Sequence, residues 1–172
     1  YDSNNPQSLS HNSVSAIYED RSGVLWVGTN DGLNRFDRDK KKFARFLYDP
    51  KAPNSLQGNS VFSIYEDRSG TLWIGTERWL NKFDRQKEQF THYEHDPQNP
   101  PDSRAKPITA ILEDRYETLW IGTRGAGLKK FDRGTGQFTH FFHDPNNSRS
   151  LSDDLVQALY EDRTGTLWIG TW

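Results

Sequence analysis

Short apolar segments alternate with polar turns along the whole chain. In the first unit, residues 14–18 are rich in β-branched and aromatic side chains, which favour a strand. Residues 24–29 carry apolar groups at adjacent positions, as is typical of a strand covered on both faces. Residues 33–37 and 43–47 follow, each after a turn signal. The pattern predicts four short antiparallel strands per unit and no helix.

The unit is repeated along the chain. The run Glu-Asp-Arg-Ser-Gly-Val-Leu-Trp-Val-Gly-Thr at residues 19–29 returns in similar form at 66–76, 113–123 and 161–171. A period in the forties means that each unit buries its faces against its neighbours. A tryptophan and a glycine two residues later in every second strand allow close approach of the adjoining sheet. We expect these positions to be structural: Trp26, Trp73, Trp120, Trp168, Gly28, Gly75, Gly122 and Gly170.

Units of this kind stack as an open solenoid or radially as propeller blades, and the long polar link between units favours the propeller. The expected fold is an all-β propeller segment, a single domain over 1–172 with units at about 8–54, 55–102, 103–149 and a partial 150–172. Three and a half blades leave apolar faces and a strand edge uncovered. We therefore predict that the isolated chain is not a stable monomer. The remaining blades would come from the parent chain or another copy, as in a homo-oligomer.

The repeated run, followed in the first unit by Gly-Leu-Asn-Arg-Phe-Asp, resembles the two-component regulator propeller repeat. That family forms the periplasmic sensor region of hybrid histidine kinases and related signalling proteins. The resemblance covers nearly the whole chain and recurs four times. It implies a seven-bladed ring, an extracytoplasmic location, and a membrane helix and kinase elsewhere in the parent protein.

Composition narrows the function classes. The chain has 22 Lys+Arg against 24 Asp+Glu with both signs interspersed, so it offers no broad basic surface for nucleic acid. It contains no cysteine, which excludes disulfides, thiolate metal sites and cysteine nucleophiles. No segment approaches the roughly 20 apolar residues of a membrane helix, so we expect no membrane contact by this segment. The chain begins with Tyr1 and lacks methionine, which suggests a piece of a longer protein.

The repeated charged residues and the histidines are candidates for chemistry. Asp20 and its three copies recur once per blade at a turn, so we expect them to cap turn amides rather than to form one catalytic or metal site. The histidines are spaced three apart on predicted strands, and such residues point to opposite faces. We therefore interpret them as outer-strand surface residues and expect neither metal nor cofactor. The histidines concerned are His92, His95, His140 and His143.

Departures from the repeat are more informative, because binding sites on symmetric scaffolds lie where loops differ. The turn after the second strand, expected at the same end as the connector between units, reads Glu77-Arg78-Trp79 in the second unit. A tryptophan on this turn would stack on a sugar ring or anchor a peptide, or else fill a gap beside the next blade. Arg104, Lys106 and Arg124 add a cationic patch suited to an acidic ligand such as a uronic-acid oligosaccharide.

Three functions remain open. The first is a non-catalytic sensor segment that binds a small ligand, such as an oligosaccharide, and transmits its occupancy to a downstream signalling domain. The second is a standalone interaction scaffold. The third is a fragment of a polysaccharide-active propeller enzyme, for which the sequence offers no Gly-x-Ser-x-Gly elbow and no phosphate-binding loop.

Overall fold

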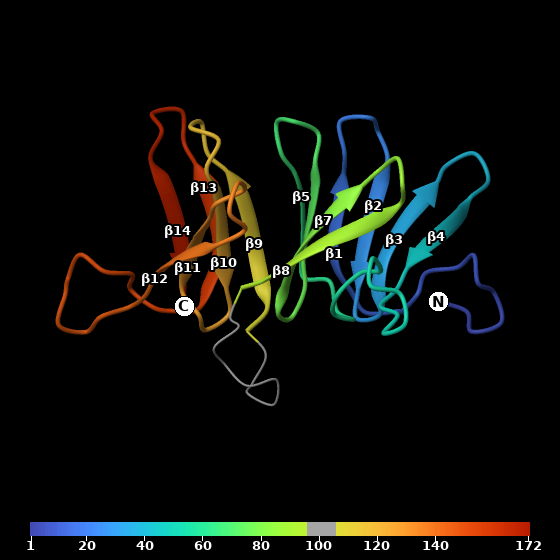
Figure 1. The fold of residues 1–172 in the computed structure, drawn as a ribbon, viewed down its shortest axis with the longest axis horizontal. Coiled ribbons are helices and arrows are strands. Elements are labelled where there is room, and N and C mark those ends of the chain that lie inside the picture. The colour runs from blue at the N-terminus through green and yellow to red at the C-terminus, as the bar shows by residue number, and fades with distance from the viewer. Residues whose placement is uncertain (96–105) are drawn as a thin grey trace.

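The computed structural model describes residues 1–95 and 106–172, and its strands form four antiparallel sheets (Figure 1). Three sheets have four strands each in the order of the chain, and the last has two. The all-β prediction is confirmed. Blade 1 is β1 (Val14–Glu19), β2 (Leu25–Thr29), β3 (Gly32–Asp37) and β4 (Lys42–Phe46). Blade 2 is β5 (Ser63–Glu66), β6 (Leu72–Gly75), β7 (Trp79–Asp84) and β8 (Gln89–Glu94).

The other two sheets repeat the pattern. Blade 3 is β9 (Ile108–Glu113), β10 (Leu119–Thr123), β11 (Leu128–Phe131) and β12 (Phe138–Phe141). Half-blade 4 is β13 (Val156–Glu161) and β14 (Leu167–Thr171). The sheets stand side by side as an arc, with the hairpin turns of each first strand pair at one end and, where the structure describes them, the connectors between blades at the other (Figure 1). Up-and-down pairing places the turn between the second and third strands at the connector end, as the sequence predicts.

Each hairpin turn between the first two strands is closed by an aspartate. Asp20 Oδ1 accepts hydrogen bonds from the backbone amides of Ser22 and Val24, both at 3.0 Å, and Oδ2 accepts the indole N–H of Trp26 at 2.8 Å. Asp67, Asp114 and Asp162 cap their turns and bind their tryptophans in the same way. The capping role predicted for these carboxylates is confirmed. The bond to the indole fixes the ring as well as the turn.

The fixed indole packs into the seam, by which we mean the contact between one blade and the next. Trp26 lies edge-on against Phe83 of blade 2, with ring centroids 5.3 Å apart, and Trp73 meets Phe131 of blade 3 at 5.5 Å. Both tryptophans are almost fully buried, at 1% and 2% exposure. Beside them the glycine two residues later leaves room for the next blade. A Cβ on Gly28 would lie 2.5 Å from Val61.

The two ends of the arc lack these partners. Trp168 of half-blade 4 is 59% exposed, although its own aspartate holds it exactly as in the other repeats. On the opposite end, Ile17 of β1 is 69% exposed, whereas the corresponding Ile64 of blade 2 packs against the core that contains Trp26. The predicted uncovered faces are therefore present in the described structure.

Replacing Gly122 by alanine should destabilise the protein by about 1–3 kcal/mol, because the added methyl group would lie 2.7 Å from Val156 of half-blade 4. Chemical denaturation followed by tryptophan fluorescence measures the change. Gly170→Ala is the matched control, since the nearest atom to its added Cβ is Ala158 of its own half-blade at 3.5 Å. Equal stability loss in the two variants would contradict the seam geometry.

Candidate functional site

Two hollows lie between blade 1 and blade 2, at opposite ends of the seam. One, the connector-end pocket, has a volume of about 500 Å³ and contains three residues that the sequence singled out: Glu77, Arg78 and Trp79. The other, the turn-end pocket, has a volume of about 450 Å³ and is lined mainly by charged side chains. The remaining lining of the connector-end pocket is Tyr48, Gln57, Gly58, Asn59 and Glu94.

The connector-end pocket combines aromatic rings with charged groups. Arg78 donates to Glu94 Oε1 at 2.8 Å, and both side chains are less than a third exposed. Glu77 Oε1 accepts the backbone amide of Ser60 at 2.8 Å, whereas Glu77 Oε2 is buried without a hydrogen-bond partner. A buried acceptor without a donor costs free energy, which a ligand hydroxyl or a water molecule would offset. The pocket can therefore offer both ring stacking and hydrogen bonding.

Trp79 does not lie on the turn, and this corrects the sequence interpretation. It is the first residue of β7 and pairs with Glu94 of β8. The corresponding Gly32 has a φ of 95°, but Trp79 does not adopt positive φ. Gly32 is likewise the first residue of its strand, and the Trp79 carbonyl accepts the Thr76 amide at 3.0 Å. The ring is partly buried and lies edge-on to His92, with centroids 6.2 Å apart.

The cationic patch is only partly brought together. Arg124 is exposed, and its backbone amide donates to the Pro107 carbonyl at 2.9 Å, so its backbone lies beside the segment that contains Lys106. Neither Lys106 nor Arg124 lines the connector-end pocket. Both belong to blade 3, where Arg124 also pairs with Leu155 of the segment that precedes β13. Arg104 lies outside the described residues.

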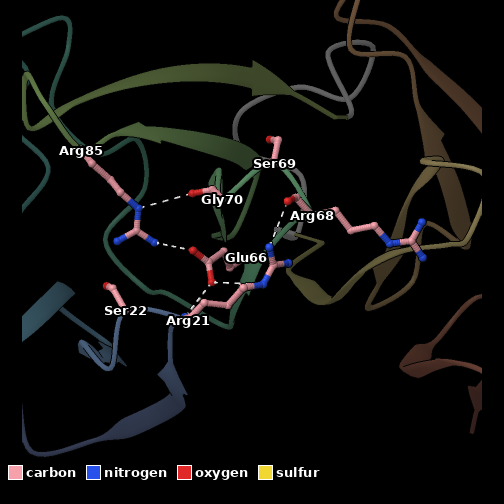
Figure 2. A pocket seen from close by; sticks show the side chains of 7 residues that line it. All are labelled: Arg21, Ser22, Glu66, Arg68, Ser69, Gly70 and Arg85. Carbon is pink, nitrogen blue, oxygen red and sulfur yellow. Dashed lines mark hydrogen bonds and ion pairs between the residues drawn. The ribbon is translucent and has the colours of Figure 1, made fainter.

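The turn-end pocket contains a charged contact between blades, which we call the seam latch (Figure 2). The Glu66 carboxylate accepts the backbone amide of Arg21 at 2.8 Å through Oε2 and the Arg85 guanidinium at 3.0 Å through Oε1. Arg85 also donates to Asp20 Oδ2 at 2.7 Å. The Arg21 guanidinium in turn donates to the carbonyls of Asp67 and Arg68 across the seam.

The latch recurs at the following seams. Between blades 2 and 3, Glu113 accepts the Arg68 amide at 2.7 Å, and Arg133 lies 2.6 Å from Glu113 and 3.3 Å from Asp67. Between blade 3 and half-blade 4, Glu161 accepts the Arg115 amide at 2.9 Å. Each guanidinium faces carboxylates or carbonyls of the protein itself, so the charges are already compensated. We assign this cluster a structural role, as the sequence predicted for the repeated Glu-Asp-Arg.

The pKa values of the four capping aspartates lie below the ordinary value. Burial alone would raise the pKa of Asp20, but hydrogen bonds from Ser22, Trp26 and Arg85 hold it well below the ordinary value. Asp67 follows the same pattern, with burial opposed by bonds from Ser69 and Trp73. At the exposed end, bonds from Thr164 and Trp168 also lower the pKa of Asp162, which has no arginine from a further blade. The cap itself therefore accounts for much of the effect.

The histidine interpretation is wrong for His95. This side chain is fully buried, with its ring 6.4 Å from that of Phe138 in blade 3, and His92 is partly buried. Only His140 and His143 are exposed as predicted. Period-two reasoning fails at His95 because β8 ends at Glu94, so the next residue no longer follows strand geometry.

Sequence reasoning also missed Lys129. In blades 1 and 2 this position is an asparagine, Asn34 or Asn81, whose Oδ1 accepts a connector amide at 2.9 Å. In blade 3 the fully buried Lys129 instead donates to the His95 carbonyl at 2.6 Å. The change from asparagine to lysine at this position of the repeat could have identified it in the sequence.

Among the described residues, no three His, Cys, Asp or Glu side chains gather to hold a metal ion.

Replacing Arg85 by alanine should lower the free energy of unfolding by about 1–3 kcal/mol, because it removes the guanidinium that bridges Asp20 and Glu66 in a largely buried seam. Asp20 then loses its charged partner, and Glu66 keeps only the more distant Arg21, whose Nε lies 3.9 Å away. The matched control is Arg38→Ala. Arg38 is the blade 1 counterpart, and both it and its partner Glu19 are more than half exposed. We expect its loss to change stability by less than about 0.5 kcal/mol in urea denaturation. Equal losses would argue against the latch.

Stability should fall as the pH drops below about 4. The folded-state pKa values of Asp20 and Asp67 are depressed, so their contribution is fully present above the unfolded-state pKa and is lost as the pH falls through the folded-state values. Urea denaturation between pH 7 and pH 2 measures this loss. Asp67→Asn should flatten the acid limb, and an unchanged acid limb would contradict the assignment.

The geometry can be compared with known proteins. A family model described as "Two component regulator propeller" matches residues 8–31, 55–78, 103–125 and 150–172. A search of curated proteins finds no match. Within the described residues, no helix is long and apolar enough to cross a membrane.

Solved structures agree on the fold. The extracellular domain of BT3049 from B. thetaiotaomicron, described as a hybrid two-component system, matches with a TM-score of 0.81 and 27% identity over 99% of this chain and 23% of its own. The extracellular domain of BT4673 from the same organism matches with a TM-score of 0.80 and 26% identity. The match covers 95% of this chain and 21% of that domain.

An inactive H270A virginiamycin B lyase from Staphylococcus aureus matches with a TM-score of 0.64 at 15% identity, over 94% of this chain and 50% of its own, which shows the fold alone. The chain spans between a fifth and a quarter of the two extracellular domains. Further blades therefore belong to propeller domains of this kind. The four family matches fall on the four repeats that build the arc, and the chain belongs to the two-component regulator propeller family.

Proposed function

We propose that this chain is a periplasmic, ligand-binding input segment of a two-component signalling protein. It catalyses no covalent reaction, and ligand binding to it is signalled to a domain elsewhere in the parent protein. Two findings support this: the family match over all four repeats, and the likeness to extracellular domains of two-component systems. The single observation that carries the ligand site is the connector-end pocket around Trp79.

The lining of this pocket suits a small ligand with a flat ring face and hydroxyl groups, such as an oligosaccharide. Trp79 and Tyr48 supply aromatic faces, and both belong to the pocket lining. Glu77 and the Arg78–Glu94 pair supply acceptors and donors for hydroxyl groups. This is the division of labour found in small-molecule sites, where apolar walls bind and a few polar groups orient.

Lys106 and Arg124 extend the proposed site toward blade 3. An acidic oligosaccharide long enough to leave the connector-end pocket would meet these cations along the same end of the arc. Charged ligands of this kind bind less tightly at high salt, because exposed charges are screened. A neutral ligand would show little salt dependence.

The ligand site is tested by isothermal titration calorimetry of the chain with neutral and uronic-acid oligosaccharides. Trp79→Ala should weaken binding at least tenfold, or about 1.4 kcal/mol, because the stacking surface is lost. Tyr116→Ala is the control, since this exposed tyrosine lies on the hairpin turn between β9 and β10, and Trp79 lies beside the turn between the second and third strands of its own blade. Binding that is unchanged in Trp79→Ala removes Trp79 from the site, and product formation during incubation overturns the non-catalytic assignment.

A further inference from the structure

The connector-end pocket is built where the second unit departs from the repeat. Glu77 stands where blades 1 and 3 have Asn30 and Arg124. Gly58 has a φ of 86°, whereas its counterpart His11 in the first unit does not adopt positive φ. Both departures line the pocket, and all of its lining residues belong to blade 2 or to the connector that precedes it. Two changes 19 residues apart in the sequence therefore meet at one place.

The two departures depend on each other. A Cβ at position 58 would lie 2.6 Å from Glu77 Oε2, so any side chain there would displace the carboxylate. The left-handed backbone of Gly58 is also one that other residues rarely adopt. The glycine thus lets the connector pass close to the Glu77 carboxylate.

The backbone of the connector holds this carboxylate in place. Glu77 Oε1 accepts the Ser60 amide at 2.8 Å. Gln57, on the same connector, donates its amide to Asn81 Oδ1 at 2.9 Å, and its carbonyl accepts the Thr76 hydroxyl at 2.7 Å. The carboxylate is therefore positioned before a ligand arrives, which reduces the entropy lost on binding.

The charges that line the pocket do not cancel. They are two carboxylates and one guanidinium, those of Glu77, Glu94 and Arg78. Arg78 donates to Glu94 Oε1 through Nε at 3.2 Å and through Nη2 at 2.8 Å. Glu77 forms no ion pair with another described residue, and its buried Oε2 receives no hydrogen bond from them. A carboxylate withdrawn from water without a cation is unfavourable, so the pocket favours a positively charged occupant.

The aromatic part of the lining favours the same class of ligand. Trp79 and Tyr48 line the pocket together with Glu77, and aromatic rings attract cations. A ligand hydroxyl can donate to the Glu77 carboxylate but leaves its charge uncompensated, whereas an ammonium group does both. A ligand carboxylate would be repelled by Glu77.

We propose that the ligand unit in the connector-end pocket carries an ammonium group and that Glu77 is the residue that selects it. The inference rests on the proposed function, in which the ligand is an oligosaccharide, and it makes the bound unit an amino sugar. The ammonium group lies against the Glu77 carboxylate, and the sugar ring packs on Trp79. Gly58 is a positioning residue, because it acts through Glu77.

The test uses isothermal titration calorimetry with three trisaccharides that share one backbone and differ at one ring position. Cellotriose carries a hydroxyl group there, the N-acetylglucosamine trimer a neutral amide, and the glucosamine trimer an ammonium group at about pH 6. Wild-type chain should bind the glucosamine trimer about tenfold more tightly than either of the other two. This comparison needs no variant.

Glu77→Gln should reduce the preference for the glucosamine trimer to less than about threefold. Glutamine keeps an acceptor for the Ser60 amide but removes the charge. The matched control is Glu88→Gln, the same change on a half-exposed carboxylate that pairs with Arg35 outside the pocket, and it should keep the wild-type preference. Urea denaturation checks that both variants are folded.

Trp79→Ala separates this inference from the proposed function. If wild-type chain binds cellotriose and the glucosamine trimer equally and Trp79→Ala weakens both, the ammonium group is not selected, although the oligosaccharide site stands. If neither these trisaccharides nor uronic-acid oligosaccharides bind, both proposals fail.

Two results with the variants also overturn the inference. A preference for the glucosamine trimer that is unchanged in folded Glu77→Gln shows that another group binds the ammonium. A preference that is lost equally in Glu88→Gln shows a general effect of net charge rather than recognition by Glu77.

Discussion

The arc depends on one hydrogen bond in each repeat. It joins the aspartate of the first hairpin turn to the indole of the tryptophan in the strand that follows, as Asp20 to Trp26. In each repeat one carboxylate closes the hairpin with Oδ1 and holds the tryptophan with Oδ2, as Asp20 holds Trp26. The indole is thereby fixed before any neighbour covers it, which Trp168 shows directly. Because the ring is already oriented, the next blade gains its burial without losing the rotamer freedom of that ring.

The seam places polar and apolar contacts in a particular order. The glycine and tryptophan contacts lie within the sheets, and the charged latch lies at the turn end, around the pocket of Figure 2. Arg85 meets Asp20 and Glu66 where it is still one-third exposed, so its charge keeps some contact with water. The carboxylates beneath it are buried but fully hydrogen-bonded. The connector end is free of this latch, which leaves it available for a variable pocket.

Much of the fold could be predicted from the sequence because it is local and repeated. The strands and the capping aspartates follow from residues within one unit, such as Asp20, Gly23 and Trp26. The uncovered ends follow from the number of units. The partners of Glu66 could not be predicted, since they lie 19 and 45 residues away and look like solvated turn charges. The pocket residues Glu77, Arg78 and Trp79 were found through broken symmetry, but Glu94 and Tyr48 were not, because strand pairing and the preceding connector bring them in.

The near-identity of the seams has a consequence for how such a chain reaches its native order. Because each seam uses the same kinds of contact, side-chain chemistry does not distinguish the correct neighbour from a blade one position further along the chain. The correct neighbour is favoured because it is nearer in the sequence, and closing the shorter loop costs less conformational entropy. We therefore expect out-of-order blade pairing to be the characteristic kinetic trap during refolding, favoured where a connector is lengthened and suppressed where it is shortened.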